Sequence, residues 1–123
     1  SDADLAGNVS AMTEALRSVR TVEITHADKD VCVEGVTVGR GHIIGLVDDK
    51  LVAGGNDVAA VTFEALVLAN LESAELVTIF SGEAARTSEI EQICSHIARE
   101  HDGVAVEVYD GGQPHYLYVI AVE

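Results

Sequence analysis

The stretch LVTIFSGEAARTSEIEQICSHIAREHDGVAVEV, residues 76–108, decides the fold. It opens on a β-branched apolar run, continues with apolar residues at helical spacing, and closes on an alternating apolar run. We therefore expect strands over 75–80 and 104–108, with a helix from Ser88 to about His101 between them. Two strands joined by a helix in this way predict a right-handed parallel crossover.

The expected helix carries its own start signal. Ser88 can accept a hydrogen bond from the third amide of the helix while Glu91 reaches back, which is the pattern of a capping box. The residues expected to face the sheet are Ile90, Ile93, Cys94 and Ile97.

The flanking segments complete the predicted sheet. A loop over 109–115 is expected to turn the chain into an antiparallel last strand over 116–122. Upstream, Glu34-Gly35 and Asp48-Asp49 indicate the turns of two hairpins, and Asp57 can cap a helix. The upstream strands are expected at 21–25, 31–33, 36–38, 42–47 and 51–53, and the helix at 57–70, with an apolar face of Val58, Val61, Ala65, Leu66 and Leu68.

Together these elements predict the α/β (α+β) class. We expect a single mixed β-sheet with two to three helices packed mainly on one face. β-Hairpins would form the first half, and a βαβ unit plus an antiparallel last strand the second. Residues 19–123 make one domain in this interpretation. Apolar residues at helical spacing predict that residues 1–18 form an N-terminal helix, which would join a missing upstream domain.

The chain is strongly acidic. Among its 123 residues, Lys and Arg total 7 and Asp and Glu total 21, which gives a net charge of -14. Nucleic acid and anionic membranes are poor partners for such a chain, whereas a protein with a basic patch suits it. We find no secretory signal and no apolar run of membrane length, so we expect a cytoplasmic location. Cys32 and Cys94 lack metal-binding spacing and are expected to be reduced and buried.

The sequence offers few candidates for catalysis or metal binding. The five histidines are scattered without the spacing of a zinc pair, so we predict no metal site and no cofactor in this chain. No GxSxG nucleophile motif is present. Ser81 and Gly82 follow an expected strand, where a hydroxyl group and backbone amides can meet a phosphate or carboxylate, and they are a weak anion-binding candidate.

The loop before the last strand is the remaining candidate. It combines a glycine pair with the only proline of the chain, and two of the three tyrosines follow it. In one interpretation it is a structural turn, after which Tyr116 and Tyr118 cover one face of the sheet. In the other it binds a partner protein, because tyrosine offers a rigid apolar body with a polar tip. The binding residues would be Gly111, Gly112, Gln113, Pro114, His115, Tyr116 and Tyr118.

These residues carry a family resemblance. The ending GGQPHYLY, residues 111–118, resembles the C-terminal end of the bacterial fatty acid kinase FakA family, dihydroxyacetone-kinase-like proteins also named YloV. Two further blocks agree in order and spacing, HIIGLVDDKLVA at 42–53 and ELVTIFSGE at 75–83. The resemblance covers nearly the whole chain.

The resemblance implies the role of a C-terminal domain. In this family an N-terminal domain holds ATP through Mg²⁺ bound by an aspartate cluster, and a middle domain carries a cysteine and histidine metal site. The third domain is thought to engage FakB, the DegV-like carrier whose fatty acid is phosphorylated. This chain resembles only the third part, so ATP and Mg²⁺ are expected only upstream, and no catalytic or metal residue is carried over.

Three hypotheses about function follow. The favoured one is a non-catalytic domain that docks the FakB/DegV-like carrier. The second is a small phosphatase or hydrolase that works through Ser81, His115 or an acidic cluster. The third is a homodimer formed through an exposed strand edge or the tyrosine loop.

Overall fold

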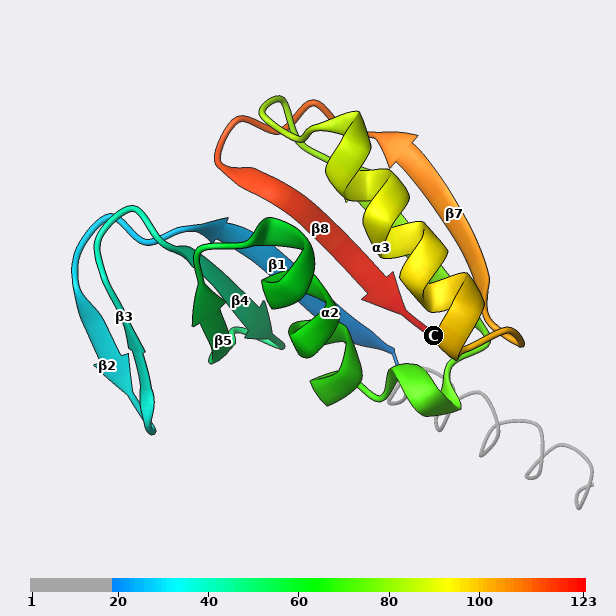
Figure 1. The fold of residues 1–123 in the computed structure, drawn as a ribbon, viewed down its shortest axis with the longest axis horizontal. Helices are drawn as coiled ribbons and strands as arrows, with labels where there is room; N and C mark the ends of the chain where they lie inside the picture. Colours follow the sequence, from blue (N-terminus) through cyan, green and yellow to red (C-terminus); the bar gives the residue numbers. More distant parts are fainter. Residues whose placement is uncertain (1–18) are drawn as a thin grey trace, which may run out of the picture.

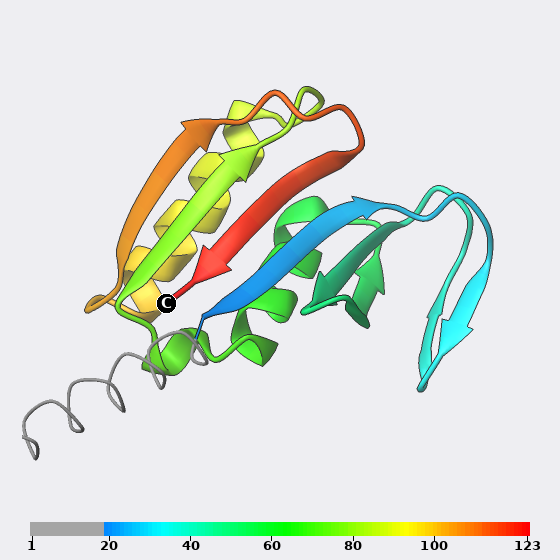
Figure 2. The ribbon, with the colours of Figure 1, turned by 180° about the vertical axis from the view of Figure 1, so that it is seen from behind.

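A computed structural model describes residues 19–123, which form a six-stranded mixed β-sheet with two α-helices on one face (Figures 1 and 2). The helix expected over 1–18 lies outside the described residues. The sheet contains β1 (Arg20–His26), β4 (Ile43–Val47), β5 (Lys50–Gly55), β6 (Leu76–Ser81), β7 (Ala105–Asp110) and β8 (Tyr116–Val122). The helices are α2 (Val58–Leu68) and α3 (Thr87–Glu100), with a short 3₁₀ turn, η1 (Leu71–Ser73), between them in sequence.

The predicted βαβ unit is present. β6 and β7 pair in parallel from Leu76 opposite Ala105 to Ser81 opposite Asp110, and α3 connects them. β8 then returns antiparallel to β6 and fills the space between β6 and β1. The strand order is β5-β4-β1-β8-β6-β7, so the last strand of the chain joins the hairpin half to the βαβ half.

The two helices begin differently. Asp57 caps α2 as expected, since its carboxylate accepts hydrogen bonds from the amides of Ala59 and Ala60. The capping box predicted for α3 is wrong. The N-cap residue is Arg86, which makes no side-chain capping bond, and Ser88 already lies in the first helical turn.

The core lies between the helices and one face of the sheet. From α3 it takes Ile93 and Ile97, with Ile90 and Cys94 packed at its margin, as the helical spacing predicts. The apolar face predicted for α2 is partly wrong, because Leu68 is 54% exposed. The fully or almost fully buried residues of α2 are Val61, Thr62, Ala65 and Leu66.

The first hairpin lies outside the main sheet. β2 (Val31–Val33) and β3 (Val36–Val38) form a separate two-stranded sheet that projects beside β5 (Figure 1). Glu34 and Gly35 both have positive φ, as the turn of a two-residue hairpin requires. Cys32 lies on β2 and is exposed, so its expected burial is wrong, while both cysteines are free thiols.

The face of the main sheet that is turned away from the helices is not covered by any other element of residues 19–123 (Figure 2). We call it the open face. In the same part of the chain, no helix is long and apolar enough to cross a membrane.

Candidate functional site

The loop between β7 and β8 is bonded to the end of β6. The amides of Gly111 and Gly112 both donate to the carbonyl oxygen of Ser81, at 2.8 and 3.0 Å. The Gln113 side chain donates through Nε2 to the carbonyl oxygen of Phe80, at 2.9 Å. The glycine pair and the glutamine therefore position the loop, whatever else the loop does.

The residues just after β6 are also hydrogen-bonded to this loop and to the start of β8. The amide of Gly82 donates to the carbonyl oxygen of Leu117 at 2.7 Å, and the amide of Glu83 donates to that of Gln113 at 3.0 Å. A Cβ atom at Gly82 would lie 1.9 Å from the Tyr116 carbonyl oxygen and 2.9 Å from that of Gln113. Only glycine fits this approach.

Ser81 and Gly82, the candidates for binding an anion, use their donors within the fold. The Ser81 hydroxyl group donates to the carbonyl oxygen of Tyr109 at 3.3 Å, and the Gly82 amide donates to that of Leu117. The first residue of α3 is Thr87, several residues further along the chain. Anion binding at Ser81 and Gly82 stays a prediction, and it requires these bonds to be replaced.

The tyrosines after the loop lie on opposite faces of the sheet. The register of β1 against β8 shifts so that Ile24 lies opposite Tyr118 but Thr25 lies opposite Tyr116. This irregularity inserts Leu117 as an extra residue, and Tyr116 and Tyr118 lose the common face that a regular strand would give them. The expectation that both cover one face is wrong.

Tyr118 belongs to the core and is not part of the surface offered to a partner. Its side chain is fully buried, and its hydroxyl group has no hydrogen-bond partner among the described residues. Burial, with a smaller contribution from the nearby Glu89 carboxylate, raises the pKa of Tyr118 to about 12. The other predicted partner-binding residues stay accessible: Gly111, Gly112, Pro114, His115 and Tyr116 are exposed and Gln113 is half-buried.

A row of side chains crosses the open face from strand to strand. Paired positions run from β4 through β1, β8 and β6 to β7, and on the first four of these strands each position lies between two buried residues. We define this open-face row as Leu46, Glu23, Val119, Phe80 and Tyr109.

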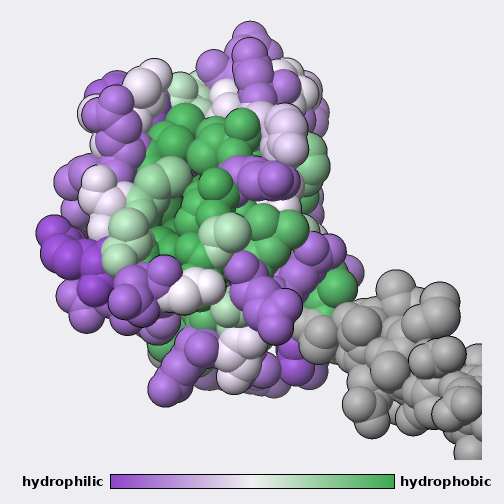
Figure 3. Space-filling model, turned by 90° about the vertical axis from the view of Figure 1, so that its right-hand side faces the viewer, coloured by the Kyte–Doolittle hydropathy of each residue, from purple (hydrophilic) through white to green (hydrophobic). Residues whose placement is uncertain are grey.

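The aromatic end of the open-face row is its most exposed part. The rings of Phe80 and Tyr109 stack with centroids 5.7 Å apart, and the two residues are 39% and 50% exposed. The Tyr109 hydroxyl group donates to Glu107 at 3.1 Å. Figure 3 views the molecule from the edge of the sheet at β7, not from the open face, and shows a hydrophobic area bordered by hydrophilic residues at this edge. This pair was not predicted from the sequence. Phe80 lies two residues after Thr78, a polar residue of β6, and side chains two residues apart on a strand share one face.

The middle of the open-face row is acidic. The Glu23 carboxyl group faces the side chains of Asp49 and Tyr116. Partial burial raises the pKa of Glu23, and the carboxyl group of Asp49 raises it further, while a hydrogen bond with Tyr116 opposes the rise. The carboxyl group of Asp49, in the β4–β5 turn, thus adds to the acidic character around Glu23.

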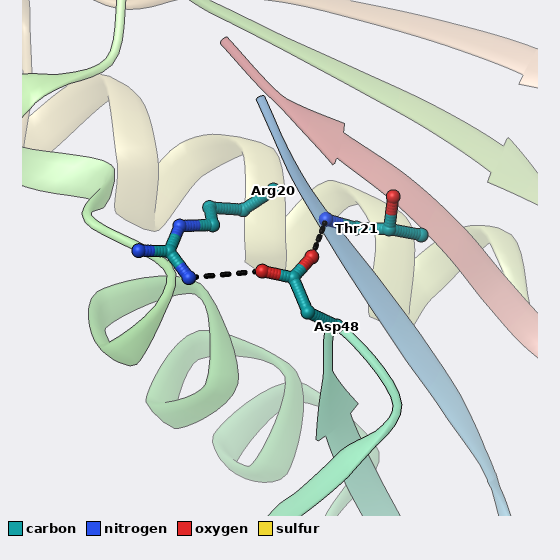
Figure 4. Close-up of polar contacts among 3 residues, drawn as sticks. All are labelled: Arg20, Thr21 and Asp48. Carbon is teal, nitrogen blue, oxygen red and sulfur yellow. Dashed lines mark hydrogen bonds and ion pairs between the residues drawn. The ribbon is translucent and has the colours of Figure 1, made fainter. Parts of the chain in front are cut away.

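Asp48, the neighbour of Asp49, holds the β4–β5 turn against the start of β1 (Figure 4). Its carboxylate accepts from Arg20 Nη1 at 2.9 Å and from the amide of Thr21 at 3.0 Å. The pKa of Asp48 is lowered mainly by the hydrogen bond from the amide of Thr21, and Arg20 lowers it further. Arg20 thus forms its ion pair with Asp48.

A groove of about 690 Å³ runs between α2 and α3 on the opposite side of the molecule. Within it the Phe63 ring stacks on His96 with centroids 3.7 Å apart, beside Glu64, Glu91 and Arg99. Across residues 19–123, no three His, Cys, Asp or Glu side chains come together as a set that could hold a metal ion.

Comparison with known proteins identifies the family. The sequence model of the C-terminal domain of FakA-like fatty acid kinases matches residues 1–123. An uncharacterized protein of Staphylococcus haemolyticus is 37% identical over 120 residues, which cover 97% of this chain and 22% of that protein. An uncharacterized protein of Staphylococcus aureus (strain USA300) is 30% identical over 122 residues, which cover 99% of this chain and 22% of that protein. The chain spans about a fifth of the length of these relatives, and it belongs to the FakA-like fatty acid kinase family as its C-terminal domain.

Proposed function

We propose that this domain is a non-catalytic docking module of a fatty-acid-kinase-like protein. It would bind the FakB/DegV-like carrier so that an upstream domain, with ATP and Mg²⁺, phosphorylates the bound fatty acid. One observation carries the proposal: the stacked pair Phe80 and Tyr109 is exposed on a sheet face that no other element of residues 19–123 covers. Exposed aromatic residues of this kind mark protein-binding surfaces.

The phosphatase or hydrolase alternative has less support. The Ser81 hydroxyl group donates to a backbone carbonyl, and His115 accepts from the Thr25 hydroxyl group through its backbone oxygen. Neither contact activates a nucleophile, which needs a base within hydrogen-bonding reach. Screening the chain against acyl phosphates and phosphate esters, with divalent metals added, tests this alternative, and we expect no turnover.

Self-association is opposed by charge. The outer edge of β7 has no partner strand among residues 19–123, so a second copy has an edge to pair with. However, that strand carries Glu107 and Asp110 and no Lys or Arg, so two copies would bring like charges together. We expect a monomer in sedimentation experiments across protein concentrations.

The proposed function is tested by mixing the chain with its purified FakB/DegV-like carrier. We expect heat in a titration calorimeter and co-migration in gel filtration, and the absence of both would contradict the proposal. Replacing His115 and Tyr116 together by alanine should weaken binding while the melting temperature changes little, because both side chains are exposed. A collapse of the melting temperature would instead show that the loop is only a structural turn.

A further inference from the structure

We propose that the open-face row is the surface that contacts the carrier, and that it fits a protein surface on which apolar side chains are flanked by Lys or Arg. This inference rests on the docking function proposed above and specifies where docking occurs and which chemistry it uses. Its two parts are the aromatic pair at one end of the row and an acidic part, which consists of Glu23 in the row and Asp49 in the nearby β4–β5 turn.

The aromatic part supplies contact area that is already ordered. Phe80 and Tyr109 stack on each other, and the backbone of Phe80 is fixed by the Gln113 side chain. The half-buried Val119 lies between Phe80 and Glu23 in the row, so the apolar surface continues toward the acidic part. Rigid aromatic residues lose little conformational entropy on binding and are frequent binding hot spots.

The acidic part sets the sign of the partner's charge. Glu23 lies opposite Leu46 of β4, Asp49 lies in the turn that follows β4, and the carboxyl group of Asp49 raises the pKa of Glu23, while Arg20 forms an ion pair with Asp48. The strands β6, β7 and β8 contain no Lys or Arg at all. A Lys or Arg side chain from a partner would relieve the repulsion between the two carboxylates, and complementary charge also speeds association.

Two other arrangements fit the structure less well. A second copy of this chain would place the same carboxylates against each other. The groove between α2 and α3 mixes both signs of charge, with Arg99 beside Glu64 and Glu91, and its aromatic residue, Phe63, is already stacked on His96. The open-face row combines exposed aromatic rings with the acidic Glu23 and contains no Lys or Arg.

The aromatic part is tested with a matched pair of variants. Tyr109→Ser removes an exposed ring from the open face, and Leu68→Ser removes an equally exposed side chain from α2. We expect Tyr109→Ser to weaken carrier binding about tenfold or more, as for a hot-spot residue, and Leu68→Ser to change it less than about twofold. The melting temperature of each variant confirms that it folds.

The charge part is tested with two double variants that change the net charge equally. Glu23→Gln with Asp49→Asn neutralises the acidic part, and Glu64→Gln with Glu91→Gln neutralises two carboxylates at the helix groove. Asparagine tolerates the positive φ of residue 49. We expect only the first double variant to weaken binding severalfold and to flatten the dependence of affinity on salt concentration.

The experiments distinguish a failure of the proposed docking function from a failure of its proposed location on the open face. If the wild-type chain does not bind the carrier, the docking function fails and this inference fails with it. If the wild-type chain binds, but both open-face variants bind equally well or the α2–α3 variants lose binding instead, only the location is wrong. Concentration-dependent dimerisation that the open-face variants abolish would show that the face pairs two copies, which also overturns the inference.

Discussion

Gly82 lies where the end of β6 meets the loop before β8, and its replacement should be costly. In Gly82→Ala the new methyl group would overlap the Tyr116 carbonyl oxygen, which belongs to the backbone and cannot rotate away. We expect a loss of about 2 kcal/mol or more in the free energy of unfolding, measured by urea denaturation.

Gly103→Ala is the matched control. No atom lies within 4 Å of its added Cβ and its φ is not positive, so it should be neutral or stabilising by about 0.5 kcal/mol. Equal stability of the two variants would show that a methyl group at residue 82 does not meet the Tyr116 carbonyl oxygen.

Tyr118 makes a second prediction at the residue scale. Its pKa of about 12 lies above the ordinary value of 10, so the folded chain keeps the phenolic proton to higher pH than the unfolded chain does. The free energy of unfolding should therefore fall as pH rises from 10 toward 12. In Tyr118→Phe this fall should be smaller, by an amount on the order of 2 kcal/mol near pH 12. At pH 7 we expect the variant to be at least as stable as the wild type, because the buried hydroxyl group has no partner to lose.

The control for this experiment is Tyr109→Phe. That hydroxyl group is exposed and bonded to Glu107, which is the main cause that raises its pKa. Because solvent screens the interaction, this variant should differ much less from the wild type at high pH. If Tyr118→Phe loses stability as steeply as the wild type between pH 10 and 12, the phenol of Tyr118 is not buried in solution.

At the residue scale, the sequence indicated the unusual loop but not the faces of its tyrosines. Period-two alternation places Tyr116 and Tyr118 together, and it fails because Leu117 is inserted against the partner strand. The irregularity lies where the loop and Leu117 are bonded to Ser81 and Gly82, residues distant in sequence, so no local pattern indicates it. The same alternation, applied to β6, would have found Phe80 on the open face.

The two α-helices give a prediction at the scale of the element. Arg86 occupies the N-cap of α3 with extended backbone and without a capping bond, and its charge lies at the positive end of the helix dipole. We expect Arg86→Ser to raise the free energy of unfolding by about 1 kcal/mol, since serine can accept from the free amides of the first turn. Asp57→Ala at α2 should lower it by about 1 kcal/mol, because the bonds to Ala59 and Ala60 are lost. Changes of the same sign in both variants would contradict the assigned caps.

The existence of the elements followed from local sequence, but their details depended on tertiary contacts. The parallel unit, the antiparallel last strand and both hairpins are confirmed. α2 is apolar on nearly all sides, so its spacing could not tell buried Leu66 from exposed Leu68. The separation of β2 and β3 from the main sheet had no local signal, because a three-residue strand has the same pattern in either sheet.

At the scale of the whole molecule, the order of the strands determines which residues form the candidate surface. Glu23, Val119 and Phe80 are far apart in sequence, and they become neighbours only because β8 is inserted between β1 and β6. Sequence reasoning placed the last strand antiparallel but had no means to choose its neighbours. The sequence therefore suggested a candidate surface in one loop, whereas the surface that we propose lies across five strands.

The net charge of -14 makes the final prediction. A compact chain with 21 acidic and 7 basic residues repels itself, and salt screens this repulsion. Raising NaCl from about 20 to 500 mM shortens the Debye length from roughly 20 Å to roughly 4 Å. We expect the melting temperature at neutral pH to rise by an amount equivalent to about 1 kcal/mol.

Acid pH and partner binding provide the controls for this effect. Near pH 4.5, the isoelectric point of the chain, the net charge vanishes and the salt effect on melting should vanish with it. Over the same salt range at neutral pH, binding of a basic partner should weaken, because screening acts there on attraction instead of repulsion. Salt is thus expected to stabilise the fold and destabilise the complex. A melting temperature that falls with salt at neutral pH would show that attractive ion pairs, such as Arg20 with Asp48, outweigh the repulsion among the carboxylates.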